Sequence, residues 1–229
     1  MKEILNISTW TIRTLLQKGK LENIKKEMER MKLNILGLSE VRWKGAGKIT
    51  SGGHEIIYSG GTESEKGVGI IVDQTVTKAI KDYWALSDRV LLVKIAGKPV
   101  DLNIIQVYAP TANSNDKNLD KFYNELDTAK TQCKSQDPLI IMSDFNAKVG
   151  TEKVDDIVGK RGLGIRNERE LGHDKVISCF QTPRPGGAQT CNRRISADLR
   201  ADLLSPVPRT PLKKIENKKC SQCLLEKDE

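Results

Sequence analysis

The sequence predicts an α/β domain built in layers, with two stacked sheets flanked by helices. Most of the segments that resemble strands are continuous apolar runs, which is typical of strands buried on both faces. Two further segments carry apolar residues at three- and four-residue spacing, which is typical of amphipathic helices. Because strand runs buried on both faces need cover on each side, we expect two stacked sheets flanked by these helices.

The expected elements follow one another as strand, helix, several strands, helix and strand. In chain order we expect a strand at 4–9, a helix at 19–31, a strand at 33–38, a glycine-rich hairpin at 45–58, a strand at 67–72, a hairpin formed by 90–95 and 100–107, a helix at 119–129 and a strand at 138–142. The hairpins are predicted by short glycine- or proline-containing turns between apolar runs.

Residues 170–229 show no sustained hydrophobic period and contain several prolines and glycines. The formal net charge is +8, of which +6 falls on residues 160–229. We therefore expect a folded domain at 1–169, followed by a divergent, disordered basic tail at 170–229, in which 195–204 can form one short helix. Such a tail permits contact with polyanions, although a solvated basic segment is the simpler interpretation.

Composition also excludes some classes of protein. No apolar run approaches the roughly 18 residues of a membrane span, and the N-terminus is too polar for a signal peptide. The five cysteines are irregularly spaced, which indicates reduced, intracellular usage and no disulfide framework or complete zinc site. We expect a nuclear or cytoplasmic protein without membrane contact; the oligomeric state stays open.

Polar side chains follow several apolar runs at the point where each run ends. Glu40, Tyr108, Asp144 and Asn146 stand at such positions. Each has an ordinary explanation alone, such as a solvated carboxylate or an Asx turn. In layered sheets, however, ligand sites gather where strands end, and converging carboxylates suit a hard cation such as Mg²⁺.

Five motifs together resemble the endonuclease/exonuclease/phosphatase superfamily, and within it the apurinic-like endonuclease domain of LINE-type (non-LTR) retrotransposons. These motifs are STWTIRTL, LSEVRW, IQVYAPT, SDFNAKVG and GIRNERE, within about residues 4–170. The resemblance implies a four-layer αββα sandwich. It also implies hydrolysis of DNA phosphodiesters that depends on Mg²⁺ or Mn²⁺, with the DNA backbone as partner.

The same resemblance assigns roles by position. Glu40 and Asp144 correspond to metal ligands, and Asp144 also to the group that activates the attacking water. Tyr108 and Asn146 correspond to catalytic residues that contact the scissile phosphate. We add Arg13, which follows the first strand, as a phosphate-binding residue.

Two departures from the family pattern bear on activity. Thr11 stands where the family has asparagine after the tryptophan, and no Asp–His ending follows His173, the last histidine. We therefore expect a C-terminally truncated domain with an incomplete second sheet and an activity that is reduced or lost. The alternatives are a catalytically dead nucleic-acid-binding remnant and a phosphatase of the same superfamily.

Overall fold

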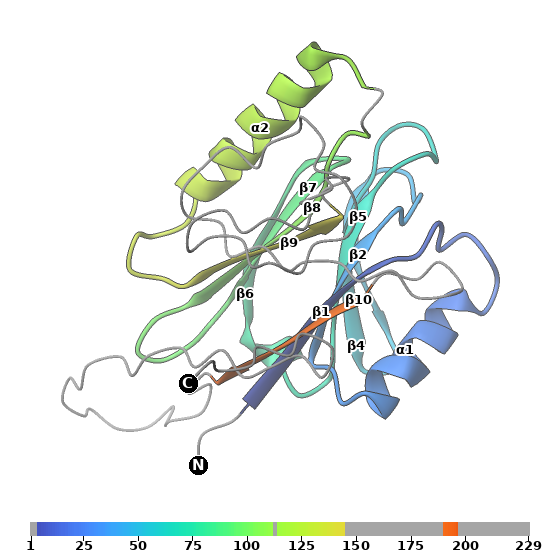
Figure 1. Cartoon of the computed structure of the whole chain (residues 1–229). Helices are drawn as coiled ribbons and strands as arrows, with labels where there is room; N and C mark the ends of the chain where they lie inside the picture. Colours follow the sequence, from blue (N-terminus) through green and yellow to red (C-terminus); the bar gives the residue numbers. More distant parts are fainter. Residues whose placement is uncertain (1–3, 112–113, 145–189, 197–229) are drawn as a thin grey trace, which may run out of the picture.

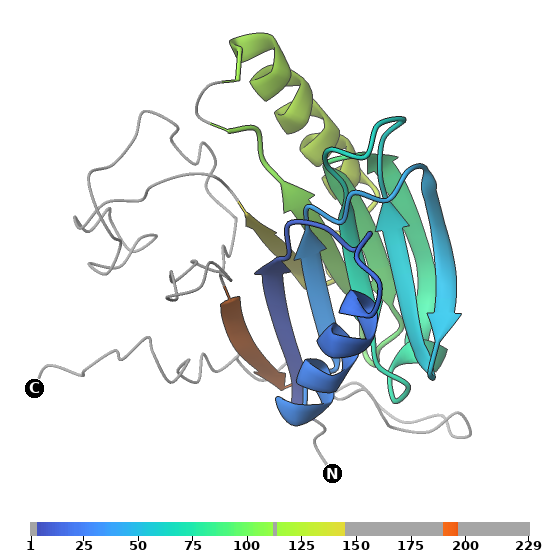
Figure 2. The ribbon, with the colours of Figure 1, turned by 90° about the vertical axis from the view of Figure 1, so that its right-hand side faces the viewer.

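A computed structural model describes residues 4–111, 114–144 and 190–196. In these residues two β-sheets pack face to face, and one helix covers the outer face of each sheet (Figures 1 and 2). Helix α1 spans Lys20–Arg30, and helix α2 spans Asp116–Thr131. The order helix, sheet, sheet, helix is that of a four-layer αββα sandwich, so the expected fold class is confirmed.

The larger sheet has the strand order β10-β1-β2-β5-β4-β3. Its strands are β1 (Ile4–Thr11), β2 (Ile35–Ser39), β3 (Ala46–Ser51), β4 (His54–Ser59), β5 (Val68–Val72) and β10 (Thr190–Ser196). Strands β1 and β2 are parallel, and the other neighbours are antiparallel. Helix α1 is the connection between the two parallel strands, as a parallel crossover requires.

The smaller sheet has the order β6-β7-β8-β9. Its strands are β6 (Ile80–Ser87), β7 (Val90–Ile95), β8 (Leu102–Tyr108) and β9 (Leu139–Asp144), and a short 3₁₀ turn, η1 (Thr77–Ala79), precedes it. Strands β8 and β9 are parallel and are joined through α2. Each sheet thus contains one parallel pair whose carboxyl ends lie side by side.

Apolar side chains fill three layers. The central layer lies between the sheets and includes Ile7, Ile35, Ile104 and Ile140. The outer layers lie between α1 and the larger sheet and between α2 and the smaller sheet. Because central strands such as β2 contribute to two layers at once, their residues are apolar without alternation.

Strand β6 is one of two strands that the hydrophobic pattern missed. It lies at the edge of the smaller sheet, is half exposed, and carries Lys81 and Asp82. Its pairing with β7 contains two irregularities in register. An edge strand with charged residues lacks the apolar run that marks the central strands.

Strand β10 falls within the stretch expected to be a disordered tail. It pairs antiparallel with β1 over seven residues, from Ile4 with Ser196 to Trp10 with Thr190. The expectation of a helix at 195–204 is wrong at its start, because Ile195 and Ser196 belong to this strand. The predicted boundary at residue 169 lies outside the described residues and stays a prediction. In the part of the chain that the structure describes, no helix is long and apolar enough to cross a membrane.

Candidate active site

The carboxyl ends of the two parallel strand pairs meet at one end of the sandwich. In the larger sheet Thr11 of β1 pairs with Ser39 of β2, and in the smaller sheet Tyr108 of β8 pairs with Asp144 of β9. Side chains alternate between the two faces of a strand, so Thr11 lies on the same face as the core residue Ile7. The same alternation places Tyr108 and Asp144 on the inner face of the smaller sheet.

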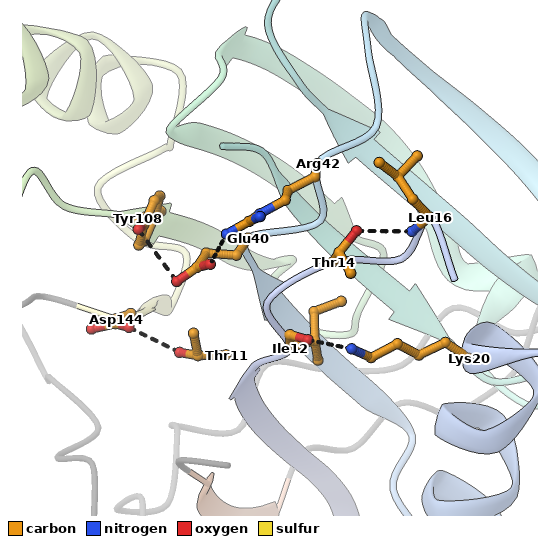
Figure 3. Close-up of polar contacts among 9 residues, drawn as sticks. All are labelled: Thr11, Ile12, Thr14, Leu16, Lys20, Glu40, Arg42, Tyr108 and Asp144. Atoms are coloured by element: carbon orange, nitrogen blue, oxygen red, sulfur yellow. Dashed lines mark hydrogen bonds and ion pairs between the residues drawn. The ribbon is translucent and has the colours of Figure 1, made fainter. Parts of the chain in front are cut away.

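Glu40 follows β2 directly and has a left-handed backbone, with φ of 59°. Its carboxylate accepts two hydrogen bonds, one from Tyr108 Oη at 3.4 Å and one from Arg42 Nη2 at 2.9 Å (Figure 3). The first bond crosses from one sheet to the other. Left-handed conformations are costly for residues other than glycine and are concentrated at functional sites.

Asp144 is the last residue of β9 and is only 9% exposed. Thr11 Oγ1 donates a hydrogen bond to Asp144 Oδ2 over 3.0 Å, which is a second polar link between the sheets (Figure 3). The backbone carbonyl of Asp144 accepts from the N–H of Ala109 at 3.0 Å, which fixes the end of β9 against β8. The carboxylate is therefore held at a defined position by both sheets.

Tyr108 lies near both carboxylates, since its hydroxyl donates to Glu40 and its strand position pairs with Asp144. Burial raises the pKa of its phenol, and the negative charges of Glu40 and Asp144 raise this pKa further, whereas Arg89 lowers it. The guanidinium carbon of Arg89 lies 5.2 Å from the ring centroid, and Arg89 Nη1 donates to the Tyr108 carbonyl at 2.8 Å. The phenol thus stays protonated near neutral pH and can act as a neutral hydrogen-bond donor.

A buried polar layer lies directly beneath these residues, and the sequence analysis missed it. Thr9 Oγ1 donates to Gln106 Oε1 at 3.3 Å, and Gln106 Nε2 donates to Ser39 Oγ at 3.1 Å. Ser39 Oγ in turn donates to the carbonyl of Val107 at 3.3 Å. The available signal was a glutamine inside the apolar run that ends in Tyr108.

The structure brings together Glu40, Tyr108 and Asp144 but not every predicted residue. Arg13 lies two residues beyond β1, with an exposed side chain and a left-handed φ of 62°. In the described part of the chain no hydrogen bond joins Arg13 to the other three. Asn146 lies outside the described residues. Arg42, which contacts Glu40, was not among the predicted site residues.

The donor chemistry of the site suits Mg²⁺. Within the described ranges there is no cluster of three or more His, Cys, Asp or Glu side chains that could enclose a metal ion. Mg²⁺, however, is usually held by one or two carboxylates, with water and substrate phosphate completing its coordination. Glu40, which accepts from Tyr108, and Asp144, which pairs with Tyr108 across the two strands, would supply such a set.

No family model matches the chain. Over 192 residues, 80% of this chain, the sequence is 40% identical to craniofacial development protein 2 of Bos taurus and 38% identical to that of Tragulus javanicus. This stretch is homologous to part of craniofacial development protein 2. The chain spans about a third of the length of these relatives, 32% and 33% respectively. The motifs quoted in the sequence analysis also resemble craniofacial development protein 2-like sequences, and that resemblance is confirmed.

Among solved structures, three nucleic-acid enzymes align with part of the chain. They are the 3' phosphatase NExo from Neisseria bound to a product DNA hairpin, the AP endonuclease LMAP from Leishmania major, and the endonuclease domain of TRAS1, a telomere-specific non-LTR retrotransposon. Their TM-scores are 0.49, 0.49 and 0.48, at 20%, 14% and 13% identity. The alignments cover 63%, 63% and 64% of this chain and 58%, 56% and 63% of those chains. The fold assignment rests on the order of layers in the described residues.

Proposed function

We propose that the chain is part of a Mg²⁺-dependent phosphodiester hydrolase that cleaves DNA internally and derives from a retrotransposon endonuclease. One observation supports this proposal above the others. Two carboxylates and a protonated phenol, from both sheets, converge where the parallel strands end. The YAPT and RNERE motifs support the retrotransposon lineage.

In this proposal each residue has a defined role, and Asp144 has more than one. A bound Mg²⁺ supplies positive charge that stabilises the phosphate as negative charge develops. Glu40 and Asp144 would hold the cation, and Asp144 would also orient the attacking water and accept its proton. Tyr108 donates its phenolic hydrogen to a phosphoryl oxygen, as a neutral donor in an electrostatic site. Arg13 and Asn146 contact the phosphate backbone.

A second candidate function is nucleic-acid binding without cleavage. It is supported by the hydrogen bonds of Glu40, whose two carboxylate oxygens are both engaged by protein groups, Arg42 and Tyr108. The hydroxyl of Thr11, where the superfamily motif has an asparagine amide, is another point in its favour. In this alternative the positively charged chain would bind DNA in a salt-dependent manner.

Nicking of supercoiled plasmid and of an abasic duplex tests the first proposal. The full 229-residue chain is incubated with each substrate over a range of Mg²⁺ concentrations, beside Asp144→Asn and the control Asp127→Asn. Asp127 lies on α2 with an exposed side chain, so its substitution removes a carboxylate away from the site. We expect nicking by the native chain and the control, and a loss of about 100-fold or more in Asp144→Asn.

Two results contradict the hydrolase. One is the absence of nicking by the native chain at high protein and Mg²⁺ concentrations. The other is nicking that survives unchanged in Asp144→Asn, which indicates a contaminating nuclease. Salt-sensitive DNA binding without nicking supports the second candidate function.

A further inference from the structure

Arg42 is the positively charged group that Glu40 contacts in this structure. Its Nη2 lies 2.9 Å from Glu40 Oε2, only two residues along the chain. Both residues are left-handed, with φ of 59° and 61°, and Val41 between them is buried. The N–H of Val41 and the N–H of Arg42 donate to the carbonyls of Gly67 and Lys66 at 3.0 Å and 2.7 Å, so the backbone that joins the pair is held in place.

The contact leaves Arg42 partly unsatisfied. Its Nε is buried and has no hydrogen-bond partner among the described residues, although Nε and Nη2 can together bind a carboxylate through two parallel bonds. The second oxygen of Glu40 accepts from Tyr108 instead. The pair is therefore a single-contact ion pair, in which the Arg42 side chain is 40% exposed and has a path to solvent.

A divalent cation at Glu40 would meet this guanidinium. Glu40 Oε2 would have to exchange the arginine for the cation, and the two positive charges would repel each other at close range. Because Arg42 is attached to the same rigid turn, it remains near the carboxylate at high effective concentration. Glu40 Oε2 can therefore bind either the cation or Arg42 of the same chain.

We propose that Arg42 competes with the divalent cation for Glu40 and so lowers the metal affinity of the site. This inference rests on the proposed metal-dependent function and adds a residue that regulates it. In the metal-free chain Arg42 neutralises the Glu40 carboxylate. When the cation binds, Arg42 leaves Glu40 Oε2 and turns to solvent.

Calorimetric titration of Mg²⁺ into the full chain tests this inference. Arg42→Gln removes the charge at similar length, Arg42→Lys keeps it, and Lys44→Gln removes a charge from the same loop. Lys44 is a matched control because its exposed side chain lies near Glu63, at 4.0 Å, rather than Glu40. We expect Arg42→Gln to bind Mg²⁺ about 3- to 5-fold more tightly than the native chain, which corresponds to the upper end of the usual strength of a partly exposed ion pair. Lys44→Gln and Arg42→Lys should stay within about two-fold.

The outcomes separate this inference from the proposed function. If the native chain binds Mg²⁺ and Arg42→Gln binds it equally or less tightly, Arg42 does not compete, while the metal-dependent hydrolase stands. An equal gain in Mg²⁺ affinity in Lys44→Gln also overturns the inference. The gain would then come from the lower positive charge of the chain and not from loss of the contact with Glu40. If neither the native chain nor Arg42→Gln binds Mg²⁺, both proposals fail.

A measurement on the native chain covers the case in which Arg42→Gln does not fold. The buried Nε–H of Arg42 gives an arginine side-chain resonance that can be assigned by its loss in Arg42→Lys. On saturation with Mg²⁺ we expect this resonance to shift and to exchange faster with solvent, because the guanidinium leaves Glu40. A resonance that stays unchanged while Mg²⁺ binds would overturn the inference.

Discussion

Replacing Gly37 by alanine tests whether the polar layer beneath the site holds the two sheets in register. Gly37 lies in the middle of β2 and faces the opposite sheet. A Cβ at this position would overlap the side-chain oxygen of Gln106, and it would lie 2.8 Å from both Gln106 Cδ and Met142 Cε. The backbone of Gly37 is not left-handed, so the effect of the substitution is one of space alone.

The expected loss follows from what Gln106 must give up when it moves. It accepts from Thr9 and donates to Ser39, and all three side chains are at most 3% exposed. Leaving a buried polar group unsatisfied costs about 1–3 kcal/mol, and overpacking a core costs about 1–3 kcal/mol. We therefore expect Gly37→Ala to lower the free energy of unfolding by about 2–6 kcal/mol. In a strand with free space, the same change would stabilise by about 0.5–1 kcal/mol.

Urea unfolding of the full chain gives this free energy, in a cycle with Gln106→Ala. The methyl group introduced by Gly37→Ala fits the space that the shortened side chain of Gln106→Ala vacates. The double variant should therefore lose at least about 1 kcal/mol less unfolding free energy than the two single variants lose in total. Gly61→Ala is the control, since its new Cβ would meet Asp88 Oδ2 at 3.4 Å, an ordinary contact. A Gly37→Ala chain as stable as the native one, or additive single effects, would refute the reasoning.

Three further predictions concern hydrogen bonds and charges. Thr11→Val removes the hydrogen bond to Asp144 and should cost about 1–2 kcal/mol in urea unfolding, whereas in an Asp144→Ala background its cost should fall below about 0.5 kcal/mol. The raised pKa of Tyr108 means that the folded state holds this proton more tightly, so the native chain should lose stability as pH rises above about 10. The unfolding free energy of Tyr108→Phe, measured between about pH 8 and 11, should not show this loss. If the unfolding free energy of both chains changes equally with pH, the prediction is contradicted. The hydrogen bond from Lys81 lowers the pKa of Asp101, so its stabilisation is present above the unfolded pKa of about 4 and is lost as pH falls through the folded value. Thermal melts should show Asp101→Asn less stable than the native chain at neutral pH, and the difference should disappear in acid.

Local sequence patterns were sufficient for the central strands, because burial on both faces leaves continuous apolar runs such as those of β2, β5 and β7. They were not sufficient for β6, whose half-exposed edge position permits charged residues. Strand β10 was missed for another reason. It forms by pairing with β1 across nearly the whole length of the chain, and local composition carries no such information.

The same distinction applies to the site. Glu40, Tyr108 and Asp144 could be proposed because the end of a strand is a local feature, and parallel strands end at the same edge of a sheet. Gln106 could not be proposed, because its partners Thr9 and Ser39 lie on the opposite sheet. How two sheets align cannot be predicted from the residues of one sheet alone. The ion pair of Arg42 depends on left-handed backbones at both Glu40 and Arg42, which no glycine marks in the sequence.

The inner faces of β1 and β8 change in composition toward the site. Along β1 and β8 the inner side chains pass from isoleucine, at Ile7 and Ile104, to Thr9 and Gln106, and then to Thr11 and Tyr108. A shift of one residue in either strand would turn this series to the other face and leave the buried hydroxyl and amide groups unpaired. The polar layer thus penalises the wrong register most strongly just beneath the site. For this reason we expect the Gly37→Ala chain to bind Mg²⁺ more weakly even where it remains folded, because Glu40 and Asp144 would no longer be held at the same separation.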